Sequence, residues 1–299
     1  MNNYAIEIKG LTKTYGSHKA IDNMSLSLEP NKIYGLLGRN GAGKTTLLNI
    51  LTGRLFADAG KGNVKVFGSP VYENVDILKQ ICYVEEKGFY SGVLKVSDIL
   101  SVVRGLYPTW DMEYEKRLLL LFELDTRKQY RQLSRGMESS LGLVIGLASR
   151  APLTIFDEPS LGLDAVIRER FYSEIIEDFT ENPRTVIIST HLIDEVNSLF
   201  EEVVIVNDGK LLLKADCAEL KSKGFYLSGR EEAVRKAAEG AVVLSEERFG
   251  GSLTLSVYSE KEIAPTEGAE VQPMSLQKLF VELINPMIHE QLVKGGIVK

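Results

Sequence analysis

The chain has 299 residues, of which 44% are hydrophobic and 25% are charged, as in an ordinary globular protein with one large core and room for a smaller second one. Its net charge of −6 and its lack of a long basic run count against nucleic acid as the main ligand. Apolar stretches such as residues 118–122 are far shorter than the roughly 20 residues of a membrane-spanning helix. Cys82 and Cys217 are too few for a disulfide framework, and no basic and apolar leader opens the chain, so we expect a cytoplasmic protein.

The first elements in chain order are short strands. Residues 4–9 alternate between apolar and polar side chains and predict an edge strand, and residues 24–28 repeat that pattern before a turn at residues 29–31. An antiparallel β layer is therefore expected at the start of the chain.

A phosphate-binding motif follows. The run GRNGAGKTT at residues 38–46 matches G-x-x-x-x-G-K-[ST], after an apolar strand at residues 33–37 and before a helix that starts at Lys44. Its backbone N–H groups would surround phosphate oxygens, Lys44 would reach the β- and γ-phosphates, and Thr45 would supply a hydroxyl to Mg²⁺. The residues expected to bind the nucleotide are Gly38, Arg39, Asn40, Gly41, Ala42, Gly43, Lys44, Thr45 and Thr46. The motif predicts ATP-type nucleotide binding with Mg²⁺, but by itself it names no reaction.

The middle of the chain is helical and then returns to strands. From residue 96 to 150 the periodicity predicts helices, one capped at Ser97-Asp98, one capped at Asp111 and one from Glu138 to Ala148. Buried strands are then expected at residues 153–156, 185–189 and 203–206, separated by helices at 167–179 and 192–200. This alternation of strands and helices is typical of a parallel, nucleotide-binding sheet in an α/β fold.

The last segment predicts a small α+β accessory domain at residues 221–299. It reads as a strand near Phe225, a helix near 231–238, two strands at 242–244 and 253–257, and a final helix at 276–283. Such a domain would regulate dimerisation, bind a ligand or simply stabilise the chain.

Two carboxylates end the apolar strand at residues 153–156. Asp157 and Glu158 would lie at the edge where a parallel sheet binds its ligands, with Asp157 on Mg²⁺ and Glu158 polarising a water. The alternative is a helix N-cap followed by a turn, which the phosphate loop upstream disfavours.

Further motifs resemble those of the ABC-type ATPases. Residues 133–137 (LSRGM) resemble the L-S-G-G-Q signature, and residues 160–164 (SLGLD) resemble the dimer-contact loop. His191, after a buried strand, resembles the switch histidine, and Tyr15 resembles the aromatic residue that stacks on adenine. The resemblance covers roughly residues 4–220, and several motifs in order are more specific than any one of them.

This resemblance implies a P-loop NTPase of ABC type in residues 1–220, with a mixed sheet core, an antiparallel β layer and a helical subdomain at about 96–150. In the family, the residues equivalent to Ser134 and Gly136 contact the γ-phosphate held by a second subunit, so ATP would join two nucleotide domains. Asp164 is expected among the nucleotide contacts.

The resemblance also assigns catalytic roles. Glu158 would be the general base or orient the water, with Lys44 on the phosphates, and His191 would contact the γ-phosphate and help to orient that water. Taken alone, Tyr15 could be half-buried packing, and His191 could be a helix cap.

The sequence departs from the family pattern in two places. Glu86 stands where relatives have a glutamine that contacts Mg²⁺ and the attacking water. A carboxylate can still ligate Mg²⁺, but it adds negative charge and cannot donate a hydrogen bond, so slow or differently regulated hydrolysis is one outcome and a solvated acidic pair is the other. In the signature, Arg135 and Met137 replace a glycine and a glutamine, and Arg135 is either solvated or a phosphate contact.

The leading hypothesis is therefore the ATP-hydrolysing subunit of a bacterial transporter, exporter-like, lying on the inner face of the membrane. Its partners would be a second nucleotide-binding subunit, identical or different, and an integral-membrane chain received by residues 87–96. The alternatives are a soluble ABC-type ATPase acting on a non-membrane partner, and a nucleotide-binding regulator without turnover. The substrate is not encoded in this chain.

Overall fold

The computed structural model of this chain describes residues 4–60, 62–85, 90–196, 198–285, 292–293 and 296–297. Backbone contacts group the chain into two compact units. Unit 1 comprises Met1–His191 with Asp208–Lys210, and unit 2 comprises Leu192–Asn207 with Leu211–Lys299. The predicted accessory domain at 221–299 lies within unit 2 and stays a prediction as a separate domain.

Unit 1 contains an antiparallel sheet of four strands in the order β2-β1-β4-β5. These strands are β1 (Ile6–Tyr15), β2 (His18–Leu28), β4 (Asn63–Val66) and β5 (Ser69–Pro70). The antiparallel layer is confirmed, but the edge position expected for the first strand is wrong. Strand β1 pairs with β2 on one side and β4 on the other, because a distant segment supplies a partner that the local pattern cannot reveal.

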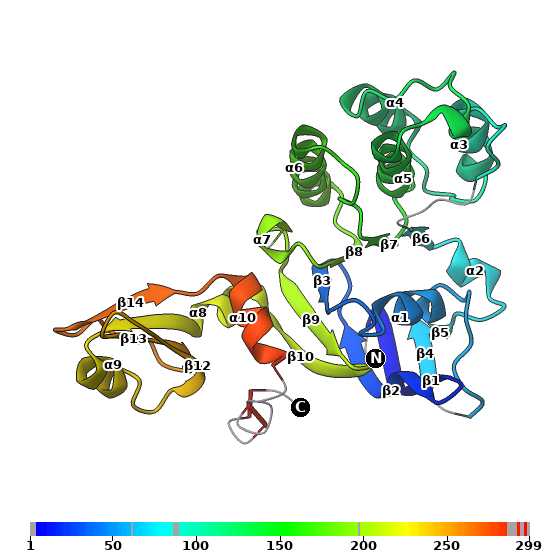
Figure 1. Cartoon of the computed structure of the whole chain (residues 1–299). Coiled ribbons are helices and arrows are strands. Elements are labelled where there is room, and N and C mark those ends of the chain that lie inside the picture. The colour runs from blue at the N-terminus through cyan, green and yellow to red at the C-terminus, as the bar shows by residue number, and fades with distance from the viewer. Residues whose placement is uncertain are drawn as a thin grey trace. The chain divides into compact units, whose positions relative to one another are not determined.

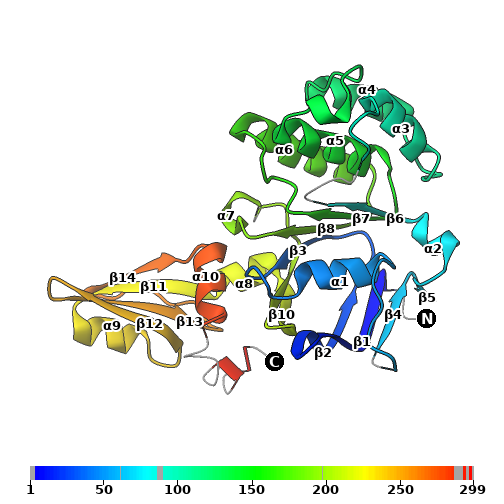
Figure 2. The ribbon, with the colours of Figure 1, turned by 45° about the vertical axis from the view of Figure 1, so that its right-hand side comes forward.

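Unit 1 also contains parallel strands. Strands β3 (Ile33–Leu37), β8 (Thr185–Thr190), β7 (Leu153–Asp157) and β6 (Ile81–Val84) pair in that order, all in parallel. Every residue of β3, β7 and β8 is buried, which explains their nearly continuous apolar sequences. Figures 1 and 2 show helices α5 (Arg135–Ala148) and α6 (Ala165–Glu181) on one face of these strands and α1 (Lys44–Leu51) on the other.

The helical part of unit 1 follows the predicted region of the chain. Helix α2 (Val75–Leu78) precedes it, and it contains α3 (Val96–Arg104), α4 (Met112–Leu121), the 3-10 turn η1 (Tyr130–Gln132) and α5. The cap at Asp111 is confirmed, because its carboxylate accepts the Tyr114 N–H at 2.9 Å. The N-cap of α3 is Lys95 instead of Ser97, and Asp98 accepts the Lys95 N–H at 3.1 Å. Helix α5 begins at Arg135, earlier than expected, because Ser134 caps it.

Unit 2 contains a second, smaller core. The helices and strands of this unit are α7 (Ile193–Val196), β9 (Glu202–Asn207), β10 (Lys210–Asp216, whose first residue belongs to unit 1), α8 (Cys217–Ser222), β11 (Gly224–Gly229), α9 (Glu231–Ala237), β12 (Val242–Phe249), β13 (Ser252–Tyr258), β14 (Ala269–Pro273) and α10 (Leu276–Leu283). The last four strands form an antiparallel sheet in the order β12-β13-β11-β14. The helix expected at residues 192–200 is short, and β14 had no clear signal in the sequence because it has five residues with few large apolar side chains and a proline at its end.

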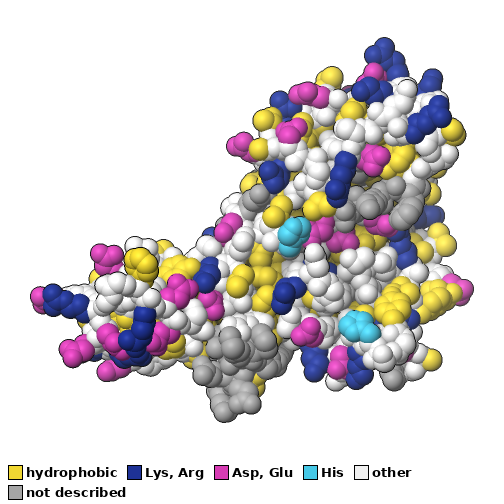
Figure 3. Space-filling view, viewed as in Figure 1, with side chains coloured by type: hydrophobic (Ala, Val, Ile, Leu, Met, Phe, Trp, Pro, Cys, Tyr) yellow, Lys and Arg dark blue, Asp and Glu magenta, His cyan; other side chains and the backbone are white. Residues whose placement is uncertain are grey.

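The surface carries charges of both signs. On the face shown in Figure 3, acidic and basic side chains are interspersed. Within the described segments, no helix combines the length and the apolar character that crossing a membrane requires.

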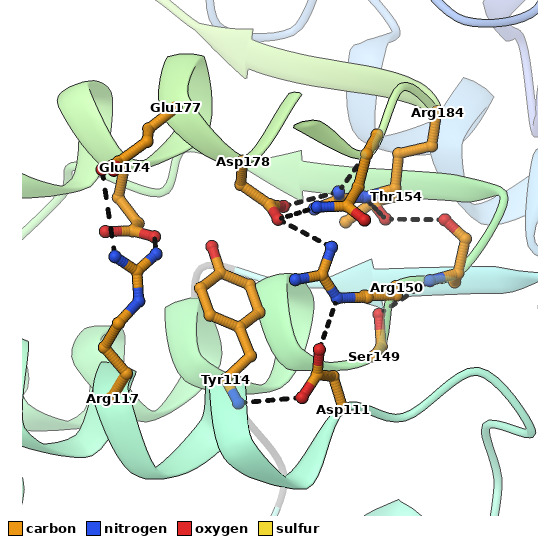
Figure 4. A network of polar contacts seen from close by, with 12 residues as sticks. Asp111, Tyr114, Arg117, Ser149, Arg150, Thr154, Glu174, Glu177, Asp178 and Arg184 are labelled. Atoms are coloured by element: carbon orange, nitrogen blue, oxygen red, sulfur yellow. Dashed lines mark hydrogen bonds and ion pairs between the residues drawn. The ribbon is translucent and has the colours of Figure 1, made fainter. Parts of the chain in front are cut away.

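A buried network of charges joins α4 and α6 to the strand starts (Figure 4). Asp178 on α6 pairs with Arg184 at 2.6 Å and with Arg150 at 2.9 Å, and Arg150 reaches Asp111 at 3.0 Å. The ring of Tyr114 lies under the Arg150 guanidinium, 4.6 Å from its central carbon to the ring centre. Asp178 and Arg184 are both buried, and removal of either would leave the other as an uncompensated buried charge, which typically costs about 3–5 kcal/mol.

Asp111 gives this network a measurable pH dependence. The Tyr114 N–H bond and the Arg150 charge hold the pKa of Asp111 below its usual value, against the opposing effect of partial burial. A carboxylate with a lowered folded-state pKa stabilises the fold above the unfolded pKa of about 3.9 and loses that effect as the pH falls through the folded-state pKa.

We predict that Asp111→Asn lowers the free energy of unfolding by about 1 kcal/mol at pH 7, since asparagine keeps the cap but loses the ion pair. The difference from the wild type should shrink as the pH falls below about 4. The free energy of unfolding is measured by urea denaturation, followed by the fluorescence of Trp110. This residue is the single tryptophan of the chain and is next to the mutated site. Glu113→Gln, on the exposed side of α4, is the control and should change stability by less than about 0.5 kcal/mol. A pH-independent difference for Asp111→Asn would contradict the assignment.

Candidate nucleotide-binding site

The loop between β3 and α1 has the backbone that the phosphate motif predicts. Gly41 and Gly43 have φ values of +83° and +104°, which side-chain-bearing residues rarely adopt. A Cβ on Gly43 would also lie 2.3 Å from the carbonyl oxygen of Ala20, so glycine is required there by space as well. Helix α1 starts at Lys44, which directs its first free N–H groups toward the loop.

A cavity of about 320 Å³ opens at this loop. It is lined by His18, Arg39, Asn40, Gly41, Gly43, Lys44, Thr45, Thr46, Asp157 and Glu158. The fold thus brings most of the predicted loop residues together with the two carboxylates at the end of β7. Gly38 also contacts the site, since its carbonyl accepts a hydrogen bond from Lys44 Nζ at 2.7 Å.

Lys44 is a buried cation. Burial lowers the pKa of its ammonium, and the nearby charges of Glu158 and Asp157 act in the opposite direction. Its donors are held by backbone carbonyls of its own loop, at 2.7 Å to Gly38 and 3.4 Å to Arg39. A buried ammonium with only neutral acceptors is suited to exchange them for the oxygens of a bound phosphate, which carry full charge.

Two oxygens suited to Mg²⁺ lie side by side in this cavity. Thr45 Oγ1 donates to Asp157 Oδ2 at 3.3 Å, and the Tyr83 hydroxyl donates to the same oxygen at 3.2 Å. Hard cations prefer such oxygens, and Mg²⁺ is commonly held by one or two protein ligands together with substrate phosphates and waters. Thr45 and Asp157 therefore fit the ion.

Tyr83 has an acidic neighbour and a basic one. Burial and the Asp157 charge raise the pKa of the Tyr83 phenol, so it remains a hydrogen-bond donor. The Arg54 guanidinium lies over its ring, 4.9 Å from the ring centre, and pairs with Glu85. Tyr83 thereby connects the candidate metal ligand to the end of β6.

Glu158 and His191 form a pair at the ends of β7 and β8. Nδ1 of His191 lies 2.8 Å from Oε2 of Glu158, and the Glu158 N–H donates to the Ser189 carbonyl at 2.8 Å. An ionised Glu158 carboxylate can only accept this hydrogen bond, which requires the donor proton to be on Nδ1 of His191. The φ of Glu158 is +51°, a left-handed conformation that is unfavourable for a side-chain-bearing residue and is often found at functional sites.

Other predicted residues lie apart from this cavity. Ser134 and Gly136 are at the start of α5, where the exposed Ser134 side chain accepts the Met137 N–H at 3.3 Å. Asp164 caps α6, accepting the N–H groups of Val166 and Ile167 at 2.9 and 3.0 Å. Their roles toward a nucleotide stay predictions.

Tyr15 ends β1 with half of its surface exposed, and the Lys13 ammonium lies 5.5 Å from its ring centre. An exposed ring is available for stacking, which is the predicted role. Glu86 lies outside the described residues, so its predicted part in metal binding and catalysis stays a prediction.

Sequence reasoning missed two residues of this site. His18 lines the cavity because β1 and β2 pair Tyr15 with His18 across their turn, and an isolated histidine near a hairpin carries no motif. Tyr83 lies within β6, and the parallel pairing of β6 with β7 brings its hydroxyl to Asp157, so no local sequence signal marked it.

Comparison with known proteins identifies the family. A family model described as ABC transporter matches residues 21–161. The bacitracin transport ATP-binding protein BcrA of Bacillus licheniformis is 32% identical over 253 residues, which cover 82% of this chain and 79% of that protein. The ABC transporter ATP-binding protein YtrB of Bacillus subtilis is 29% identical over 218 residues, covering 73% and 74%.

Solved structures share the fold. The structure of an ATP-binding subunit of an ABC transporter aligns with a TM-score of 0.66 and 23% identity, over 73% of this chain and 92% of that one. A dimeric ATP-binding cassette in a post-hydrolysis state, bound to ADP and Pi, aligns with a TM-score of 0.63 and 21% identity over 71% and 98%. Together with the identity to BcrA over most of both chains, these findings establish that this chain belongs to the ATP-binding proteins of ABC transporters and is an ATPase subunit with the ABC-type P-loop fold.

Proposed function

We propose that two nucleotide-binding subunits, one of them this chain, close around ATP, and that Mg²⁺-dependent hydrolysis at the site described above drives export through a separate membrane-spanning chain. The observation that carries the catalytic part is the Glu158–His191 pair, 2.8 Å apart, beside Lys44 and Asp157.

The residues divide the chemistry between them. ATP hydrolysis passes through a loose, in-line transition state, so the protein mainly positions water and stabilises spread negative charge. Glu158 is a carboxylate that can orient the attacking water and accept its proton, while Lys44 neutralises the β- and γ-phosphates. Bound Mg²⁺, held by Thr45 and Asp157, would supply charge neutralisation across the phosphate oxygens.

His191 has a restricted role in this arrangement. Its Nδ1–H is used by Glu158, so its Nε2 is an acceptor in the neutral ring. Nε2 can donate to a γ-phosphate oxygen only in the doubly protonated imidazolium. His191 therefore donates a hydrogen bond to the Glu158 carboxylate both as the neutral ring and as the imidazolium. It donates to the phosphate only as the imidazolium.

The surface positions of Ser134 and Asp164 support the proposed dimer. Ser134 is exposed at the positive end of α5, and Asp164 is exposed at the start of α6. A helix N-terminus with an exposed hydroxyl suits a phosphate. Because Ser134 lies apart from the nucleotide cavity of its own chain, that phosphate would belong to the ATP of a second subunit.

A second cavity supports docking of the membrane partner. It has a volume of about 280 Å³ and is lined by Arg54, Tyr83, Val84, Glu85, Tyr90, Glu138, Gly142 and Ile145. Val93, in the segment predicted to receive the partner, is 63% exposed. Since Tyr83 also binds Asp157, a partner seated here would contact a neighbour of the candidate metal ligand.

Two similarities favour export over other functions. The relatives include proteins named for the transport of bacitracin and of lantibiotics, and the closing helix α10 resembles the last helix of many exporter subunits. The alternative is a soluble ATPase switch on a non-membrane partner such as nucleic acid, for which the interspersed charges of Figure 3 offer little support. Affinity capture from native membranes separates the two, because recovery with nucleic acid or ribosomes alone would rule out transport.

We predict that Glu158→Gln lowers kcat of Mg²⁺-dependent ATP hydrolysis by about 100- to 1,000-fold, because the amide cannot accept the proton of the water. Binding of ATP should change by less than about threefold, since the loop is unaltered. Phosphate release and fluorescent-nucleotide binding measure the two effects. Glu169→Gln, the same change on the exposed side of α6, should retain wild-type turnover. Undiminished hydrolysis by Glu158→Gln would remove Glu158 from the mechanism.

We predict that Val93→Asp reduces co-purification of the membrane partner by about tenfold, because it replaces an exposed apolar side chain of the predicted docking segment with a charge. The side chain is exposed, so the ATPase activity of the isolated chain should not change. Quantitative recovery of the partner from native membranes is the measurement. Leu120→Asp is a matched control, because Leu120 is 81% exposed on α4, away from this segment in sequence. Equal recovery with Val93→Asp and wild type would exclude the segment from docking.

A further inference from the structure

A short chain of hydrogen bonds runs from Glu158 to the start of α5. The carbonyl oxygen of Glu158 accepts the Leu161 N–H at 3.1 Å. The carbonyl oxygen of Leu161 then accepts the Ser139 hydroxyl at 2.9 Å. Two contacts therefore connect the backbone of the proposed catalytic residue to a side chain one turn after Ser134.

The same two segments are in very close backbone contact. A Cβ on Gly136 would lie 2.9 Å from the carbonyl oxygen of Gly162, and a Cβ on Gly162 would lie 2.9 Å from Cγ of Arg135. Both distances are shorter than real Cβ contacts, and the φ of Gly162 is +85°. The first turn of α5 and the loop at residues 160–163 thus fit together at a fixed separation.

The Ser139 hydroxyl has a second acceptor. It lies 3.1 Å from the Arg135 carbonyl, the ordinary bond of a helical serine to the preceding turn. A hydroxyl has one proton, and the Leu161 carbonyl is the nearer acceptor. Thr180 on α6 shows the ordinary case, since its hydroxyl donates to the Ile176 carbonyl in the preceding turn at 2.8 Å.

We propose that Ser139 is a positioning residue that couples the two ATP sites of the dimer. The proposal rests on the proposed function, in which Glu158 acts on the nucleotide of its own subunit while Ser134 and Gly136 contact that of the opposite subunit. A displacement of the Glu158 backbone is transmitted through Leu161 and Ser139 to the first turn of α5, which contacts the nucleotide of the opposite subunit. Ser139 contacts no nucleotide itself.

The experiment compares Ser139→Ala, Ser139→Thr and Thr180→Ala in two backgrounds. In the Glu158→Gln background, analytical ultracentrifugation measures dimerisation with ATP. In the wild-type background, ATPase rates measured against ATP concentration give the Hill coefficient. Fluorescent-nucleotide binding to the monomer reports the phosphate loop alone, and thermal unfolding reports the fold.

Ser139→Ala should weaken ATP-dependent dimerisation about tenfold and bring the Hill coefficient down toward 1, since one hydrogen bond is lost and the carbonyl of Leu161 is left unpaired. Nucleotide binding by the monomer should stay within about twofold. Alanine favours helix, so unfolding is not the expected cause. Ser139→Thr keeps a hydroxyl and should restore both values, and Thr180→Ala should match the wild type.

Dimerisation and cooperativity that Ser139→Ala leaves unchanged would overturn the coupling role while the proposed function stands. Equal losses in Ser139→Thr and Thr180→Ala would also overturn it, because the effect would then be one of general helix stability. Failure of the Glu158→Gln protein to dimerise with ATP, both with itself and with a different nucleotide-binding subunit recovered with it from native membranes, would overturn the proposed function, and the coupling role with it.

Discussion

The parallel pairing of β3, β8 and β7 is the constraint on which the site depends. In this register Leu37 lies opposite Thr190, and Asp157 lies opposite Ser189, so all three strands end at one edge. The phosphate loop, the acidic pair of Asp157 and Glu158, and His191 each lie at one of those strand ends. Since each strand is buried along its whole length, a slip in register would expose apolar side chains and is strongly opposed.

The opposite ends of the same elements are fixed by charge. Arg184 precedes β8, Arg150 precedes β7, and both pair with Asp178 on α6. Asp111 and Tyr114 bring α4 to this cluster. The strands that carry the predicted catalytic groups are thus connected at their far ends to the helical part through these ion pairs.

Strained backbone and close contacts occur both at the candidate nucleotide site and at the start of α5. Gly43 is pressed against Ala20, Gly136 against Gly162, and Glu158 adopts a left-handed backbone. Such positions persist only where the surrounding structure holds them, here a buried sheet and a hydrogen-bonded loop. The Ser139 contact extends that rigidity from Glu158 to the signature turn.

The sequence by itself determined the nucleotide motif, the buried strands predicted at 153–156 and 185–189, the helical region and the ABC family. These are local signals, because a continuous apolar run, a cap such as Asp111 or a glycine-rich loop is encoded by neighbouring residues. The tertiary structure decided which strands pair, so it made β1 an interior strand and revealed β14. It also decided the contacts of Thr45 with Asp157, separated by 112 positions, and of Glu158 with His191, separated by 33. The roles of Tyr83 and Ser139 likewise depend on partners far along the chain, whose distance in space no local pattern specifies.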